Sequence, residues 1–219
     1  MKGPAFYRAT IGKKVVMAVT GVILVGWIIG HVLGNLLVFR GPAALNEYAA
    51  LLKSNAALLW AMRAGLLVTV VLHVVAAVQL VRQEAASRPA RYTKKVPQES
   101  TFASRTIRWG GLIIAVFVVY HLLHFTTGDL HPAFSHTDVY GNMTTAFAVP
   151  WVAAIYIVAV AALGLHLYHG VWSVFQTLGI SHPGMGNARR RLAIGIAAIV
   201  YLGFTAIPVA FLLGLLGSR

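Results

Sequence analysis

Four long apolar stretches of this sequence each carry a histidine well inside the stretch, namely His31, His73, His121 and His166. A histidine in the hydrocarbon region of a membrane is energetically costly, and such residues usually have a function. Imidazole nitrogen is a common axial ligand of haem iron, so four membrane-embedded histidines could supply two pairs of axial ligands. The chemistry indicated by these residue types is therefore bis-histidine ligation of two haems.

The four stretches that hold these histidines belong to a set of five apolar stretches, each long enough to cross a bilayer as a helix of about 20 residues. The chain is 58% hydrophobic and 11% charged, whereas soluble domains carry about 25% charged residues. The sequence therefore predicts an all-α integral membrane protein, whose first four helices form a bundle around two stacked b haems. We expect a single domain, residues 1–219, with helices at about residues 15–39, 58–81, 107–127, 148–174 and 192–216.

The segments between the predicted helices differ in character. Residues 40–57 are expected to contain a short amphipathic helix, with Leu45, Tyr48 and Leu52 on one face. Residues 128–147 contain two aspartates and two histidines but no lysine or arginine, and they are expected to be a loop. The chain has no cysteine, which excludes disulfides, iron–sulfur ligation and covalent c-type haem attachment within it.

Glycines recur every four residues in the first predicted helix, at Gly26, Gly30 and Gly34. This spacing creates a smooth helix face, which would suit either a closely packed neighbouring helix or a flat macrocycle. The position of His31 directly after Gly30 favours the macrocycle.

Basic residues are concentrated at the helix ends that lie on one side of the predicted membrane. Four lie in residues 1–14, seven in residues 82–108 and three in residues 189–191, which together are 14 of the 18 lysines and arginines. By the positive-inside rule, the N-terminus is cytoplasmic and, after five crossings, the C-terminus is outside. The net charge of +13 is thus a topology signal, and nucleic-acid binding is not expected.

The depths of the four histidines indicate how they pair. At about 1.5 Å per helical residue, His31 and His121 lie roughly 24 Å and 21 Å from the basic ends of their helices. His73 and His166 lie roughly 12 Å from those ends. In a ring of four helices the first faces the third and the second faces the fourth. We therefore expect the pairs His31–His121 and His73–His166, holding two haems at heights that differ by about 10 Å.

The remaining histidines are weaker candidates. His124 and His169 each lie three residues from a proposed ligand and on the same broad helix face. They are expected to support a haem, for example by bonding a propionate, or to be hydrogen-bonded core residues. His131, His136 and His182 lie in predicted loops and are expected to be solvated.

Other functions for membrane-embedded histidines fit the pattern less well, although any one of the four could be a structural or proton-relay residue. A zinc site needs ligands that converge on one tetrahedral centre, and these imidazoles lie at two depths. A proton-coupled transporter would be expected to carry acidic residues inside its helices. The five acidic residues lie in loops or at helix ends: Glu47, Glu84, Glu99, Asp129 and Asp138.

Several segments resemble a known family. They are TIGKKVVMAVTG and GHVLGNLLVF in the first helix, RWGGLIIAVFVVYHLLHF in the third and GLHLYHGVWSVFQTLG in the fourth. These residues resemble the cytochrome b subunit of succinate dehydrogenase, in the five-helix, single-subunit, two-haem form called type B. The resemblance covers nearly the whole chain, and its GHVLGN and HGVWS segments are fairly specific.

The resemblance implies both a ligand set and a reaction. The family's axial ligands match His73 and His166 for the haem nearer the iron–sulfur subunit, and His31 and His121 for the outer haem. Electrons from succinate would pass through a flavoprotein subunit and an iron–sulfur subunit, docked on the cytoplasmic face, to both haems and then to a membrane quinone, which is expected to be menaquinone. The protein would be a multi-pass protein of the bacterial inner membrane. Some relatives carry a glutamate two residues before the fourth-helix ligand, where this chain has Gly164, so a proton pathway of that kind is not expected.

The function expected from the sequence is thus that of the haem b anchor of respiratory complex II, without any flavin or dicarboxylate site of its own. Two redox alternatives stay open: the same anchor in a quinol:fumarate reductase, and the haem b subunit of another oxidoreductase such as a hydrogenase or formate dehydrogenase. An alternative of a different class is a non-redox, histidine-containing transporter. Quinone reduction takes up two protons with two electrons, and Glu47, beside Tyr48, is the candidate acid/base at an outer quinone site. The alternatives are that Glu47 is a solvated carboxylate and that the quinone binds at the inner face.

Overall fold

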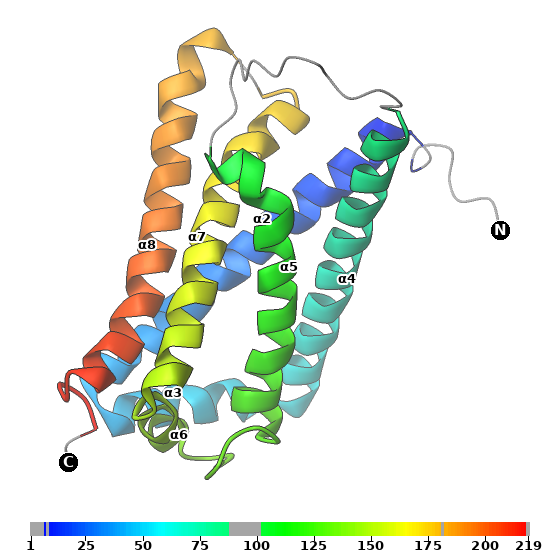
Figure 1. Cartoon of the computed structure of the whole chain (residues 1–219). Helices are drawn as coiled ribbons and strands as arrows, with labels where there is room; N and C mark the ends of the chain where they lie inside the picture. Colours follow the sequence, from blue (N-terminus) through cyan, green and yellow to red (C-terminus); the bar gives the residue numbers. More distant parts are fainter. Residues whose placement is uncertain (1–6, 8, 88–101, 181, 218–219) are drawn as a thin grey trace.

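The computed structural model describes residues 7, 9–87, 102–180 and 182–217, and every regular element in these ranges is a helix (Figure 1). Five helices within the described residues are long and apolar enough to cross a membrane. The all-α transmembrane architecture expected from the sequence is confirmed. The spans are α2, Thr10–Asn35, continued by η1, Leu36–Arg40; α4, Ala56–Ala86; α5, Phe102–Leu122, continued by η2, Leu123–Thr127; α7, Pro150–Thr177; and α8, Gly186–Leu212.

Each spanning helix is longer at its basic end than the hydropathy pattern predicts. The first begins at Thr10 instead of about residue 15, and the last begins at Gly186 instead of about residue 192. Hydropathy marks where an apolar run stops, but lysine, arginine and glutamine are good helix formers, so the helix continues beyond the hydrocarbon region. Among the described residues, basic side chains at these ends, such as Lys13, Arg82 and Arg105, therefore extend from helical turns.

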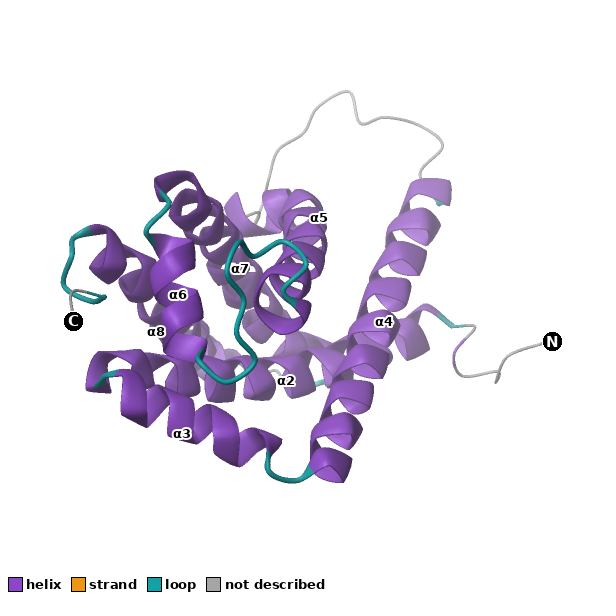
Figure 2. Cartoon of the chain, turned by 90° about the horizontal axis from the view of Figure 1, so that it is seen from below, coloured by secondary structure: helices purple, strands orange, loops and turns teal. Residues whose placement is uncertain are grey.

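Two short helices lie together at the opposite end of the bundle (Figure 2). The first, α3, Pro42–Lys53, is the amphipathic helix expected in residues 40–57. The second, α6, Val139–Phe147, lies in the segment that was expected to be a loop, so that expectation was wrong. Its sequence contains glycine, asparagine and two threonines, which are poor helix formers. The helix forms because Asp138 caps its first turn and because its apolar residues are buried.

The spanning helices form an incomplete ring. Helix α2 crosses the bundle obliquely and packs against α4 and α7, and α7 packs in turn against α5 and α8 (Figure 1). In contrast, α4 and α5 are not closely packed against each other within the described residues. Going around the ring in the order α4, α2, α7, α5, helix α2 is diagonal to α5, and α4 is diagonal to α7.

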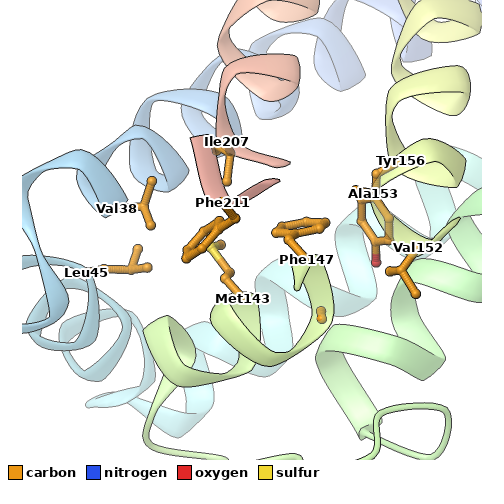
Figure 3. Close-up of a cluster of buried hydrophobic side chains, with 10 residues drawn as sticks. Val38, Leu45, Met143, Phe147, Val152, Ala153, Tyr156, Ile207 and Phe211 are labelled. Atoms are coloured by element: carbon orange, nitrogen blue, oxygen red, sulfur yellow. The ribbon is translucent and has the colours of Figure 1, made fainter. Parts of the chain in front are cut away.

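The packed apolar core lies toward the end of the bundle that carries α3 and α6 (Figure 3). It contains Phe147 of α6, Tyr156 of α7 and Phe211 of α8, with Val38 of η1 and Leu45 of α3. Of the most apolar 18 residues in each spanning helix, 39% are buried in α7, against 6% in α4 and none in α5. Helix α7 is thus the central support, while α4 and α5 are each held along one side.

Candidate functional site

The structure brings the four membrane-embedded histidines together in two pairs. The ring centroids of His31 on α2 and His121 on α5 are 5.9 Å apart, with the ring planes at 79°. Those of His73 on α4 and His166 on α7 are 6.2 Å apart, at 65°. Each pair joins two diagonal helices of the ring. These are the two pairings expected from depth in the sequence; that the pairs ligate haem stays a prediction.

The separation within each pair fits one metal ion between two imidazoles. A bond from a metal to an imidazole nitrogen is about 2 Å long, so two such nitrogens on opposite sides of one ion are about 4 Å apart. Since each ring centre lies about 1 Å behind its nitrogen, the two centroids would be separated by roughly 6 Å. Within the described residues no three metal-ligating side chains cluster as a metal site. Each pair thus offers two protein ligands, which is the number that a haem iron accepts at its axial positions.

The hydrogen bond that His73 makes through Nδ1 leaves its other ring nitrogen, Nε2, free to bind a metal. Its Nδ1 lies 3.0 Å from the hydroxyl oxygen of Thr20. That hydroxyl donates its only proton to the backbone carbonyls of Val16 and Met17, at 2.7 Å and 3.1 Å, so its oxygen can accept from the imidazole. With the proton on Nδ1, Nε2 keeps its lone pair. Partners of this kind fix the tautomer and orientation of a metal-ligating histidine.

The other three histidines have different partners at Nδ1. In the His31 ring this nitrogen lies 3.3 Å from the side-chain amide nitrogen of Asn35, which also donates to the backbone carbonyl of His31 at 2.8 Å. In the His121 ring it lies 3.4 Å from the hydroxyl of Tyr156. In the His166 ring it is buried and has no hydrogen-bond partner among the described residues. The four imidazoles therefore differ in the hydrogen-bond partner of Nδ1.

Small residues lie directly against the inner pair of rings, His73 and His166. A side chain added to Gly21 would place its Cβ 3.5 Å from the His73 ring, and one added to Gly111 would reach 4.0 Å from the His166 ring. An apolar cavity of about 190 Å³ lies between α5 and α7, with His166 in its wall. The cavity leaves room beside His166, and both rings of the pair lie against glycine backbone.

The glycine stripe of α2 has two kinds of surroundings along its length. A Cβ on Gly34 would lie within 3 Å of the Tyr48 ring of α3, so this glycine permits close packing of the two helices. A Cβ on Gly26 or Gly30 would meet nothing within 4 Å. The part of the stripe just before His31 is therefore exposed, while the end of the stripe at Gly34 is a helix-packing site.

Aromatic rings hold the outer pair, His31 and His121. Trp27 stacks on His31 with centroids 4.7 Å apart and planes at 17°, and Phe204 of α8 approaches the same ring at 5.6 Å. Phe117 stacks one turn away on the His121 ring, at 5.9 Å and 30°. Since aromatic side chains have few rotamers, this packing restricts both imidazoles to narrow orientations. It also makes α8, which carries no candidate ligand, part of the outer site.

Comparison with known proteins gives the family. A model of the family described as succinate dehydrogenase/fumarate reductase transmembrane subunit matches residues 81–206, more than half of the chain. This chain belongs to that family. No curated protein and no solved structure matches the chain. The matched region includes His121 and His166, one member of each histidine pair, whereas His31 and His73 precede it.

In this transmembrane subunit the remaining histidines have different environments. His124, expected to support a haem or to be satisfied in the core, is buried and lies 2.9 Å from the Tyr156 hydroxyl through Nδ1. His169 is half-buried on α7. His136 and His182 are exposed, as expected for loop residues. The expectation for His131 was wrong, because it is 7% exposed and donates from Nε2 to the backbone carbonyl of Asn142, at 2.9 Å.

Tyr156 is the residue of this site that sequence reasoning missed. A tyrosine in an apolar helix has no pattern that distinguishes a hydrogen-bonding role from a packing role. Only the folded arrangement places its hydroxyl between His121 and His124. The same is true of Thr20, because nothing in its local sequence shows that it faces His73 on another helix.

The three carboxylates at the end of the subunit that carries α3 and α6 have unequal environments. Asp138 accepts hydrogen bonds from the Gly141 amide and from the Asn46 side chain, both at 2.9 Å, and these bonds hold its pKa below the usual value of 3.8. Asp129 accepts a short hydrogen bond from the Thr127 hydroxyl. Glu47 is exposed on α3, and its side chain makes no hydrogen bond with the described residues. Of the three, Glu47 is therefore the carboxylate without a side-chain partner in the described part of the chain.

Basic side chains mark the other end of the subunit. Arg190 and Arg191 are exposed in the first turns of α8, and Arg108 near the start of α5 pairs with Glu84 near the end of α4. Much of the basic segment 82–108 lies outside the described residues. The described basic residues agree with one strongly positive end of the bundle.

Proposed function

We propose that this subunit is the di-haem cytochrome b anchor of a succinate:quinone oxidoreductase, respiratory complex II, and that it delivers electrons from an iron–sulfur subunit to a membrane quinone. The observation that carries the proposal is the occurrence of two imidazole pairs, each with centroids about 6 Å apart on diagonal helices, in a chain of this family. Menaquinone is the quinone that we propose.

In this proposal His73 and His166 hold the haem nearer the iron–sulfur subunit, and His31 and His121 hold the outer haem. When bound, each haem b supplies a site that takes up one electron and gives it on. The chain contributes the ligands, orients them through Thr20 and other neighbours, and surrounds them with apolar helix faces. Second-shell hydrogen bonds and burial are among the means by which a protein adjusts a haem potential.

The proposed orientation places the basic end in the cytoplasm, which puts the N-terminus inside and the C-terminus outside. The flavoprotein and iron–sulfur subunits would dock at the basic end, close to the His73–His166 pair. The setting that we propose is the bacterial cytoplasmic membrane. Support comes from the five apolar helices and from the position of Arg108, Arg190 and Arg191 at one end.

The quinone is proposed to bind at the outer end of the bundle, where electrons leave the His31–His121 pair. Glu47 is the proposed acid/base there, because it is the outer carboxylate without a hydrogen-bond partner among the described residues. A general acid must be able to reach the group that it protonates, and an exposed residue on a short helix is free to do so.

A quinol:fumarate reductase is the second candidate, favoured by the description of the matched family, which names both enzymes. Both functions would use the same four histidines. The direction of electron flow would then be reversed, and the residues of this chain would have the same roles. Comparison of succinate oxidation with fumarate reduction by the purified complex separates the two.

The decisive experiment is to purify the complex from its native membrane through an affinity tag on this subunit. We expect a flavoprotein and an iron–sulfur protein to co-purify, and a reduced-minus-oxidised visible spectrum to show two b haems for each copy of the subunit. Partners without any haem spectrum would contradict the ligand proposal. A haem spectrum together with subunits of a hydrogenase or formate dehydrogenase would contradict the proposed enzyme.

A further inference from the structure

A buried polar cluster adjoins the outer histidine pair and is not used by the function proposed above. It consists of Tyr156 on α7, His124 in η2 and His131 in the loop that follows. Tyr156 is 7% exposed, His124 is 2% exposed and His131 is 7% exposed. Buried polar groups nearly always have hydrogen-bond partners. For each hydrogen bond of this cluster we can therefore ask which group is the donor and which is the acceptor.

The Tyr156 hydroxyl lies between two imidazole nitrogens. Its oxygen is 2.9 Å from Nδ1 of His124 and 3.4 Å from Nδ1 of His121. The rings of Phe117, Phe125 and Phe147 contact the tyrosine ring edge to face, with centroids 5.0, 5.6 and 5.1 Å away. Tyr120 also packs edge to face on this ring, with centroids 6.0 Å apart. Within the described residues, however, the hydrogen-bond partners of the Tyr156 hydroxyl are the two imidazoles.

A phenol has one proton to donate, so it can donate to only one of these nitrogens and must accept from the other. If His121 presents Nε2 to a metal, its proton is on Nδ1, and the imidazole donates to the tyrosine oxygen. The hydroxyl then donates to Nδ1 of His124, at the shorter of the two distances. Ligation by His121 thus fixes the direction of both hydrogen bonds.

The far side of the cluster is anchored to the backbone. His131 donates from Nε2 to the carbonyl of Asn142, at 2.9 Å, and accepts at Nδ1 from the amide of Ala133, at 3.1 Å. Its ring lies against that of His124, with centroids 5.0 Å apart, and Tyr120 stacks on His124 from α5 at 5.2 Å. His124 is therefore held in place, and through it so is the Tyr156 hydroxyl.

We propose that Tyr156 is a positioning residue for the outer haem site, which fixes the tautomer of His121 and strengthens its bond to iron. This inference rests on the proposed ligation of haem by His121. A histidine that donates its second ring proton to an acceptor is a more basic ligand. A more basic ligand favours ferric over ferrous iron, so the bond lowers the midpoint potential of the site. His166, whose Nδ1 has no partner within the described residues, has no such support in the inner site.

The test replaces Tyr156 with phenylalanine in the full complex and measures both haem midpoint potentials by spectroelectrochemical titration, with the low-spin EPR signals. We expect Tyr156→Phe to keep both haems, to move one midpoint to a more positive value with a changed EPR signal, and to leave the other midpoint unchanged. Tyr120→Phe is the matched control, because that tyrosine stacks on His124 beside the cluster and its hydroxyl makes no hydrogen bond with the described residues. Unchanged potentials and EPR signals in Tyr156→Phe would overturn the proposal.

A second variant covers the case in which Tyr156→Phe loses the outer haem. His124→Phe removes the acceptor of the tyrosine proton but keeps the oxygen that His121 donates to. Because linked hydrogen bonds polarise one another, we expect this variant to keep both haems and to move the midpoint potential of the outer site to a more positive value. No shift in this variant, with both haems present, would overturn the proposal. Failure of the ligand assignment itself is recognised separately, because His121→Ala would then retain both haems.

Discussion

The imidazole rings of His73 and His166 have centroids 6.2 Å apart, although α4 and α7 are not among the helix pairs that pack closely in the described part of the chain. The two side chains thus meet across the ring of helices, where the backbones are held apart. Gly21 and Gly111 lie against these rings, so the space beside them is not taken by other side chains. This position supports the proposal that the two imidazoles share a bound group.

Substitution of single histidines should remove one haem and spare the other. His73→Ala and His166→Ala should each lose the inner haem, and His31→Ala and His121→Ala the outer one, because a bis-histidine haem that loses one ligand is poorly held. Haem quantification and redox titration of the four purified variants, with unsubstituted complex as reference, check this. If His31→Ala and His73→Ala lost the same haem, the pairing would be wrong.

Partner subunits should contact the basic end of the bundle. A photo-crosslinking residue at Met185, exposed beside the start of α8, should form adducts with the iron–sulfur subunit, because that end is proposed to be cytoplasmic and close to the inner histidine pair. The same residue at Leu130, exposed at the opposite end, is the control and should form none. Adducts from Leu130 and not from Met185 would reverse the proposed orientation.

The features that sequence predicted well are those that depend on local pattern. Runs of apolar residues identify the five helices, and the number of residues between a helix end and His31 or His121 gives the height of that histidine. Height then restricts pairing, because two side chains can meet only if they lie at the same level. For this reason the ring pairs could be anticipated without coordinates.

The features that sequence missed depend on contacts between distant segments. Helix α6 has a composition typical of a loop and is stabilised by capping and by burial of Phe147 against Phe211. His131 is buried because the loop that carries it folds onto Asn142. The roles of Thr20 and Tyr156 likewise arise between helices. Such contacts leave no periodic signal in one sequence.

Close packing of α2 on α3 should make Gly34 intolerant of a side chain. A Cβ at this position would lie within 3 Å of the Tyr48 ring, and overpacking of this kind costs about 1–3 kcal/mol. Gly34→Ala should therefore lower the thermal unfolding temperature of the detergent-solubilised complex. Gly65→Ala is the control, because a Cβ there meets nothing within 4 Å. The combination of Gly34→Ala with Tyr48→Ala should show less than the sum of the two single effects; strict additivity would refute the contact.

The Asp138 cap should give α6 a pH-dependent stability. Its carboxylate accepts from the Gly141 amide and from Asn46, which lowers its pKa in the folded protein. A lowered carboxyl pKa stabilises the folded state at pH values above the ordinary 3.8, and this contribution is lost as the pH falls through the folded-state value. Asp138→Ala should cost about 1 kcal/mol near neutral pH and less near pH 3.

The neutral cap of α4 provides the comparison for Asp138. Asn55 accepts from the Leu58 amide at 3.0 Å and carries no charge, so Asn55→Ala should cost a similar amount that does not change with pH. Thermal melts of both variants at several pH values measure the difference. A defect in Asp138→Ala that is equally large at pH 3 would show that ionisation of the carboxylate plays no part.

Glu47 provides the test of the proposed outer quinone site. Glu47→Gln keeps the shape of the side chain and removes its ionisable group, so proton delivery would be lost while the fold and both haems stay. General acid catalysis typically contributes a factor of about 100 or more, and a decrease of that order in quinone reduction by succinate is expected, with a changed pH profile.

Asp129→Asn is the matched control, because Asp129 is an outer carboxylate already hydrogen-bonded to Thr127. Haem reduction by succinate should be normal in both variants, since it precedes the quinone step. Unchanged quinone reduction across pH in Glu47→Gln would exclude it as the proton donor and direct the search to the inner face, beside His166 and the cavity between α5 and α7.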